Sequence, residues 1–230
     1  STRKESSAAS DVYKRQTLTL GIASMVLAFG IGIPLGVTAA VHQNGWGDRI
    51  SMIIALLGVS IPTFWLAMLM VLLFSLKLRW FPASGIGGWE YYVLPTVSLC
   101  FGGLATQARQ SRSSMLEVIR SDYVVTARAK GLSQREVIFK HALPNALNPI
   151  ITLAGNNLAV IFGGSVVIEN VFSFPGIGQY MINAINQRDY PIVRGCVVML
   201  AVVFAVIMLL VDLCYAFNDP RIKSRYVNTG

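Results

Sequence analysis

The chain has 230 residues, of which 54% are hydrophobic and only 13% charged, and its mean hydropathy is +0.58. Soluble domains carry roughly 25% charged residues, so this composition excludes an ordinary soluble enzyme and indicates an integral membrane protein. The net charge of +8 is typical of basic loops beside a bilayer and does not indicate a nucleic-acid partner.

The first sixteen residues differ from the rest of the chain. They are polar and rich in Ser and Ala, and they contain neither the apolar region nor the cleavage site of a signal peptide. We expect residues 1–16 to be a non-native or disordered leader, and a first membrane span to be missing before Thr17.

Five uncharged runs are long enough, or nearly so, to cross a bilayer as helices. A spanning helix needs about 20 apolar residues, and a central Arg or Lys costs roughly 2.5 to 3.5 kcal/mol. The runs are 17–41, 50–76, 91–108, 142–168 and 195–211, the last extending past Asp212 to 217. Backbone groups in lipid must be hydrogen-bonded within the segment. We therefore predict an all-α, multi-pass transmembrane bundle over 17–217 with about five spans, followed by a tail, 218–230.

The basic residues between the runs predict the orientation. Eleven lie on one side: Arg49, Arg109, Arg112, Arg120, Arg128, Lys130, Arg135, Lys140, Arg221, Lys223 and Arg225. Only four lie on the other: Lys77, Arg79, Arg188 and Arg194. The positive-inside rule then places the loop 109–141 and the C-terminus in the cytoplasm. With five spans the N-terminus lies outside, although four basic residues among 1–16 favour the opposite side.

Several polar or small residues fall inside the predicted spans. Ser60, Pro62 and Thr63 form a kinked polar patch in the second, and Asn156 and Asn157 lie in the middle of the fourth. Each set either lines a translocation path or hydrogen-bonds within the bundle. The small residues Gly21, Gly30, Gly32 and Gly36 are more typical of close helix packing. The cysteines Cys100, Cys196 and Cys214 are interpreted as small hydrophobic residues, with no metal or redox role.

The loop 109–141 contains signals for two short helices. Ser121 or Asp122 is suited to begin the first, and Gly131 stands where a helix ends in a left-handed residue. Ser133 and Glu136 form a capping box for the second, which Pro144 and Pro149 limit or kink. The loop is therefore predicted to be a compact helical projection.

The first of these helices places Val124, Ala127 and Gly131 on one side. We interpret this small-residue surface as suited to enter a cleft of another protein. The alternatives are an ordinary capped connection between spans, or a DNA-reading helix-turn-helix. The net charge of the loop and its two membrane tethers disfavour DNA.

The loop resembles the cytoplasmic signature of the permease subunits of binding-protein-dependent ABC importers. That signature runs Glu-Ala-Ala, three residues, Gly, nine residues, Ile-x-Leu-Pro. The matching positions are Ala127, Gly131, Leu143 and Pro144. Val125 and His141 replace the Glu and the Ile, a departure that is similar to the dipeptide, oligopeptide and nickel branch.

Other segments are similar to the same branch, so the resemblance covers residues 17 to about 226. They are Leu18-Thr-Leu, Gly32-Ile-Pro-Leu-Gly36, Ser60-Ile-Pro-Thr-Phe64, Phe172-Ser-Phe-Pro-Gly-Ile-Gly178 and Asp219-Pro-Arg-Ile222. The resemblance implies the fold of a type I ABC importer permease. It also implies a multi-pass location in the bacterial inner membrane and import of di- or oligopeptides, nickel complexes or glutathione.

The resemblance further implies the partners. The loop 109–141 would seat in a groove of two cytoplasmic ATPase subunits, and a homologous second permease and an external solute-binding protein would complete the importer. The residues expected to carry ATPase coupling are Asp122, Tyr123, Thr126, Ala127, Arg128, Lys130, Gly131, Leu132, Ser133, Leu143 and Pro144. No cofactor is expected on this chain, because it lacks a Gly-x-x-x-x-Gly-Lys-Ser/Thr loop. ATP and Mg²⁺ would be bound by the partners.

The resemblance also suggests that the turn around Phe172, Phe174 and Pro175 packs near an external gate and meets the binding protein. The alternative for these aromatic residues is an interfacial belt. Catalytic and metal sites are not expected, since His-Glu-x-x-His and Gly-x-Ser-x-Gly are both missing from the sequence. The alternative function is an ATP-independent secondary carrier or channel for a small polar solute.

Overall fold

The computed structural model describes residues 2–218, with side chains for all of these except 2–11, 159, 212 and 214–218. The elements in chain order are α1 (Thr2–Val41), α2 (Trp46–Ser60), α3 (Thr63–Met70), the π-helix η1 (Val71–Lys77), α4 (Glu90–Ile119), α5 (Asp122–Ala129), α6 (Gln134–Glu136), the π-helix η2 (Val137–Ala142), α7 (Leu143–Val171), α8 (Ile177–Asn186) and α9 (Tyr190–Asn218). The described part contains no strand, so the predicted all-α class is confirmed.

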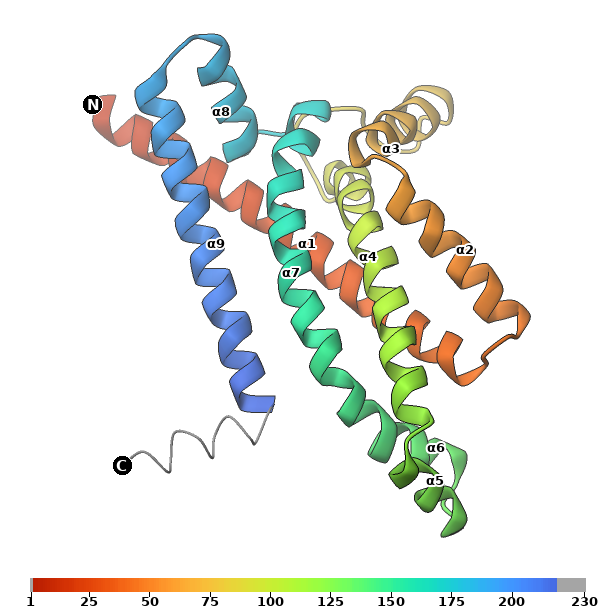
Figure 1. Ribbon diagram of the computed structural model, residues 1–230. Helices are drawn as coiled ribbons and strands as arrows, with labels where there is room; N and C mark the ends of the chain where they lie inside the picture. Colours follow the sequence, from red (N-terminus) through yellow and green to blue (C-terminus); the bar gives the residue numbers. More distant parts are fainter. Residues whose placement is uncertain (1, 219–230) are drawn as a thin grey trace, which may run out of the picture.

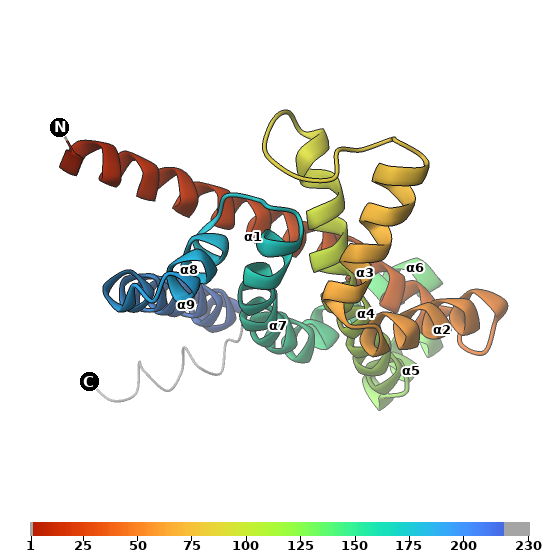
Figure 2. The same cartoon turned by 90° about the horizontal axis from the view of Figure 1, so that it is seen from above.

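The long helices alternate in direction between two ends of the bundle (Figure 1). Helices α1, α4 and α9 run toward the end that carries α5 and α6, whereas α2 and α7 run back toward the end that carries α3 and α8. Seen from above, α4 and α7 lie between α2 on one side and α9 on the other (Figure 2). This alternation is the one expected of a chain that passes back and forth across a bilayer.

Length and composition qualify three helices of the described part as membrane spans. They are Val12–Val41, Gln134–Val171 and Tyr190–Val211, with a fourth if the bent pair Trp46–Ser60 and Thr63–Lys77 is one span. Helix α4, which holds the predicted span 91–108, does not qualify. Its inward side buries Thr96, Ser98, Gln107 and Ser111, and it packs against α1, α2, α3 and α7. These polar residues lower its hydropathy although it lies inside the bundle.

The second predicted span, 50–76, is broken at the kinked patch that the sequence predicts around Ser60, Pro62 and Thr63. The chain bends by 103° between α2 and α3. Ile61 has extended backbone angles, φ −82° and ψ 123°, as expected of a residue before proline, and Pro62 has no N–H to continue the helical ladder.

The predicted leader, 1–16, is helical from Thr2 onward and forms the first part of α1. That residues 1–16 are a non-native or disordered leader stays a prediction. The predicted tail, 218–230, lies outside the described residues apart from Asn218.

Close backbone packing joins α1 to α4. A Cβ on Gly36 would lie 2.3 Å from the carbonyl oxygen of Ala108, and a Cβ on Gly32 would lie 2.8 Å from that of Leu104. Both distances are too short, so the predicted packing role of Gly32 and Gly36 is confirmed. Gly21 is equally crowded by the Phe162 ring, whereas nothing lies within 4 Å of the position of a Cβ on Gly30.

Two apolar clusters fill the two halves of the bundle. One, near α3 and α8, includes Leu20, Leu99, Ile161, Phe172 and Phe174. The other, near α5 and α6, includes Val37, Met115, Val124, Val137 and Ile150. Cys100 and Cys196 are buried and unpaired, in line with their interpretation as small hydrophobic residues.

Candidate functional site

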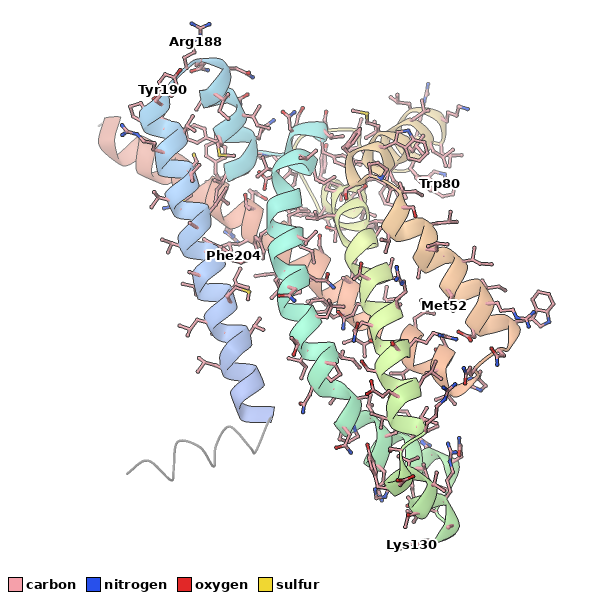
Figure 3. The ribbon with its side chains drawn as sticks, in the orientation of Figure 1. Met52, Trp80, Lys130, Arg188, Tyr190 and Phe204 are labelled. Atoms are coloured by element: carbon pink, nitrogen blue, oxygen red, sulfur yellow. The ribbon has the colours of Figure 1, made fainter. Side chains whose placement is uncertain are left out.

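The predicted projection forms at one end of the bundle, with Lys130 at its tip (Figure 3). Helix α5 begins after Ser121, whose extended backbone, ψ 150°, suits an N-cap. The Ser121 hydroxyl does not cap α5, however, because it donates to the carbonyl oxygen of Val118 at 2.6 Å. Ser121 therefore ties the end of α4 to the start of α5.

The turn between α5 and α6 depends on the backbone of Gly131. Its φ is +79°, in the left-handed region, and nothing lies within 4 Å of the position that a Cβ would take. Glycine is therefore required here by its conformation and not by lack of space. The Gly131 N–H donates to the carbonyl oxygen of Arg128 at 3.0 Å. The predicted left-handed helix end at Gly131 is confirmed.

The capping box at the start of α6 is also confirmed. The Glu136 N–H donates to the Ser133 hydroxyl at 3.3 Å, while the Ser133 N–H donates back to the Glu136 carboxylate at 3.3 Å. Lys140 adds an ion pair with Glu136 at 3.4 Å. The end of the projection is thus ordered by contacts between residues close in sequence.

The face of α5 that carries Val124 and Ala127 lies inward. Val124 is 0% exposed and Ala127 is 6% exposed, and both belong to the apolar cluster with Met115, Val137 and Ile138. This corrects the interpretation of that face as a surface that enters another protein. The spacing predicts the shared face correctly, but its apolar residues hold α5 against the rest of the chain.

The opposite face of α5 and the turn beyond it are exposed. Four large apolar side chains of α5, of the turn after it and of η2 are open to solvent: Tyr123, Val125, Leu132 and Phe139. Of the other predicted coupling residues, Asp122, Thr126, Arg128, Lys130, Gly131, Ser133 and Pro144 are exposed, while Leu143 is half-buried. The sequence prediction missed Val125 and Phe139. The sequence did contain a signal for Phe139, because it is an aromatic residue between the basic residues Arg135 and Lys140 of a connecting loop.

A salt bridge at the same end holds α2 to α4. The Arg112 guanidinium donates to the two carboxylate oxygens of Asp48 at 2.5 and 2.7 Å, and the Asn44 N–H donates to the same carboxylate at 2.9 Å. The hydrogen bond to Asp48 raises the pKa of Arg112 above its ordinary value. The sequence prediction also missed this pair, because its members are far apart in the chain.

The polar residues predicted to line a path divide into different roles. Asn157 is buried, and its amide donates to Gln107 Oε1 at 3.3 Å. Gln107 in turn donates to the carbonyl oxygen of Ile150 at 3.1 Å. Asn157 therefore joins α7 to α4, whereas its neighbour Asn156 is exposed.

The other predicted path residues lie at the bend between α2 and α3. Ser60 and Pro62 are exposed and Thr63 is half-buried, and the Ser60 hydroxyl donates to the carbonyl oxygen of Leu56 at 2.8 Å. A groove of about 520 Å³ between α1, α7 and α9 is lined by apolar residues such as Ile22, Leu158 and Leu210 and contains none of the predicted path residues. That the set lines a translocation path stays a prediction.

The aromatic residues of the turn after α7 are part of the core. Phe172 and Phe174 are both buried, and the Phe174 ring meets Tyr92 edge to face at a centroid distance of 5.0 Å. An interfacial belt is therefore not their arrangement. Within the part of the chain whose residues are described, no three His, Cys, Asp or Glu side chains come together as metal ligands.

Comparison with known proteins places this geometry in a family. Residues 32–224 match the family model described as "Binding-protein-dependent transport system inner membrane component". The chain is 45% identical over 226 residues to the dipeptide transport system permease protein DppB of Bacillus subtilis (strain 168), a match that covers 97% of this chain and 73% of that protein. It is 42% identical over 207 residues to the glutathione transport system permease protein GsiC of Escherichia coli (strain K12), covering 90% of this chain and 68% of that protein.

Solved structures agree in fold. A chain of the MetNI methionine ABC transporter in an inward-facing conformation aligns with a TM-score of 0.77 at 22% identity, covering 94% of this chain and 98% of that one. A chain of an amino acid ABC transporter aligns with a TM-score of 0.67 at 14% identity, covering 96% and 97%. The chain therefore belongs to the family of binding-protein-dependent transport system inner membrane components, as a permease subunit and not an enzyme.

Proposed function

We propose that this permease subunit works in an ATP-driven importer of short peptides. Its partners would be a second, homologous permease, two ATPase subunits that bind the loop 109–141, and an external solute-binding protein. The observation that carries the proposal is the exposed face of α5 and the turn after it, because this face projects from the bundle and carries large apolar side chains.

The exposed side chains of the projection formed by α5, α6 and η2 suit a protein partner. Tyr123 is 45% exposed and Phe139 is 56% exposed, and the basic side chains of Arg128 and Lys130 are exposed nearby in the chain. Aromatic anchors within a polar rim are typical of the centre of a protein interface. An apolar pocket with an acidic edge on each ATPase would be complementary to it.

The packing behind this face supports a mechanical role. Val124 and Ala127 hold α5 against Met115 of α4 and against Val137 and Ile138 of η2, and η2 continues directly into α7. A displacement of α5 would therefore be passed to α4 and α7. ATP and Mg²⁺ would be bound and used by the ATPase subunits, with no cofactor on this chain.

Short peptides are the proposed cargo. The DppB and GsiC relatives are named for transport of dipeptides and of glutathione, and both are small peptides with free carboxylate and amino groups. We place the chain in the bacterial inner membrane with α5, α6 and the C-terminus in the cytoplasm. Reporter fusions at Arg120 and Asn228 should then report cytoplasm, and a fusion at Ile177 should report the exterior.

The test of the function is co-purification of the detergent-solubilised chain with its partners from the native host. Wild type should recover a second permease and ATPase subunits. Phe139→Ala, Tyr123→Ala and Gly131→Trp should each weaken recovery of the ATPases and leave the second permease bound. Ile185→Ala is the matched control, since Ile185 is a similarly exposed apolar residue on α8.

Transport should follow the same pattern. Membrane vesicles that contain the wild-type importer and its binding protein should take up a labelled dipeptide on addition of ATP, and the three loop variants should lose uptake. Recovery of the wild-type chain alone, with uptake that does not need ATP, would instead support a self-contained carrier.

A further inference from the structure

A buried carboxylate lies at the end of the bundle opposite the loop 109–141. Glu169, near the end of α7, is 0% exposed. The Thr17 hydroxyl of α1 donates to one of its oxygens at 2.7 Å. The N–H groups of Gly178 and Gln179 donate to the other at 2.7 and 3.3 Å. One side chain therefore joins α1, α7 and α8.

Thr17 takes part twice in this network. While its hydroxyl donates to Glu169, the oxygen accepts a hydrogen bond from the Ile177 N–H at 2.9 Å. Thr17 is itself 1% exposed. The first N–H groups of α8 are thus satisfied by side chains of two other helices.

The glycines of the turn before α8 leave room for the carboxylate. A Cβ on Gly176 would lie 2.3 Å from the Glu169 carboxyl carbon, and a Cβ on Gly178 would lie 2.8 Å from a carboxylate oxygen and 2.5 Å from Val166 Cα. Gly176 has φ −116° and ψ 179°, which any residue adopts. Space, and not backbone conformation, therefore requires glycine here, and the Pro175-Gly-Ile-Gly178 sequence forms a cradle around Glu169.

The carboxylate supplies what the start of α8 lacks. The N-cap of α8 is Gly176, which makes no side-chain cap, and the first N–H groups of a helix have no partner within it. Glu169 and Thr17 therefore hold the start of α8. The helix is also held by the Tyr13 and Tyr180 rings, which stack at 5.1 Å, and by packing against α7 and α9.

We propose that Glu169 is a positioning residue of the transport cycle, which latches α8 to α1 and α7. Helix α8 buries Ile177 and Ala184 and exposes Tyr180, Asn183 and Ile185. While the hydrogen bonds of Glu169 and Thr17 are intact, a force on the exposed side of α8 moves α1 and α7 with it. This proposal rests on the proposed function in one respect: the force on α8 would come from the external solute-binding protein.

The latch itself is tested by cysteine labelling of the full chain in membranes, in a variant whose three cysteines are replaced by alanine. Ala184→Cys reports the buried side of α8, and Asn183→Cys is the exposed control. Glu169→Gln and Thr17→Val keep the side-chain shapes but weaken or remove the hydrogen bonds. Either should speed maleimide labelling at position 184 by about tenfold, since buried donors at the start of α8 are left without their partners. Thr17→Ser retains the hydroxyl and should label as slowly as wild type. Labelling at position 183 should be the same in all variants.

The consequence for transport is tested on the assembled complex, with the external binding protein and a dipeptide as the stimulus of ATP hydrolysis. Glu169→Gln and Thr17→Val should keep the basal rate and lose most of the stimulation, and Thr17→Ser should restore it. Unchanged labelling at position 184 together with unchanged stimulation would overturn the latch. If wild type itself shows no ATPase partner or no stimulation, the proposed function fails, and the labelling rates alone decide whether the latch exists.

Discussion

At the end of the bundle that carries α5 and α6, most polar contacts join near neighbours in sequence, whereas at the opposite end they join distant segments. Ser133 and Glu136 cap each other across three residues, and Gly131 turns the chain with no contact around it. Glu169, by contrast, accepts from Thr17, 152 positions earlier in the chain.

The two ends therefore have different roles. The α5 end presents a surface to a partner, and the α8 end joins helices of the same chain. The α5 end is built to form locally and to leave its outer face free for a partner. The α8 end is built around a buried carboxyl group, which has to be hydrogen-bonded because an unpaired polar group is costly away from water. Substitutions around Glu169 should therefore cost stability, and substitutions on α5, on α6 and in the turn between them should cost coupling with a smaller loss of stability.

The largest effect is expected for Gly178→Ala. The added Cβ would meet both Val166 Cα and the Glu169 carboxylate, so we expect the free energy of unfolding to fall by about 3 kcal/mol. Thermal unfolding of the detergent-solubilised chain measures this. Gly163→Ala in α7 is the control, since nothing lies within 4 Å of its added Cβ, and it should be neutral or stabilising. Equal midpoints for the two variants would contradict the cradle.

A smaller effect is expected for the salt bridge between α2 and α4. Asp48→Asn removes the charge that Arg112 meets with two hydrogen bonds, and we expect a loss of about 2 kcal/mol. A double-mutant cycle with Arg112→Gln measures the pair. Additive losses in the cycle would show that the two residues act independently.

Gly131→Ala should cost about 1 kcal/mol, because φ is +79° at this position and a Cβ disfavours the left-handed region. Gly131→Asn is the matched variant, since Asn tolerates this conformation better than Ala. Thermal unfolding should rank wild type above Asn and Asn above Ala. The reverse order would mean that the turn does not hold Gly131 in this conformation.

The smallest effect on stability is expected for Ser133→Ala. It removes a capping hydroxyl from an exposed three-residue helix, and we expect a loss of about 0.5 kcal/mol. The dipeptide-stimulated ATPase rate of the assembled complex should fall more clearly than the unfolding midpoint. A large drop in the midpoint, comparable with that of Gly178→Ala, would erase the distinction between the two ends.

The sequence by itself determined the features that depend on near neighbours. Uncharged runs fixed the membrane class, and the positions of Gly131, Ser133 and Glu136 fixed the ends of the two short helices in the loop. The Gly32 and Gly36 pair indicated close helix packing. The membrane class depends on transfer into lipid and the helix ends depend on the local backbone, so neither needed knowledge of the fold. The glycine pair indicated a close neighbour but not which helix it would be.

Only the tertiary structure decided which face of α5 is free and what the buried polar residues do. The periodicity of Val124 and Ala127 marks an apolar face but does not say which segments cover it, and α4 and η2 proved to be among them. Asn157, Asp48 and Glu169 find their partners 50, 64 and 152 positions away in the chain. Such pairs form only when the helices pack. They cannot be predicted from one stretch of the sequence, because that stretch contains only one partner of each hydrogen bond.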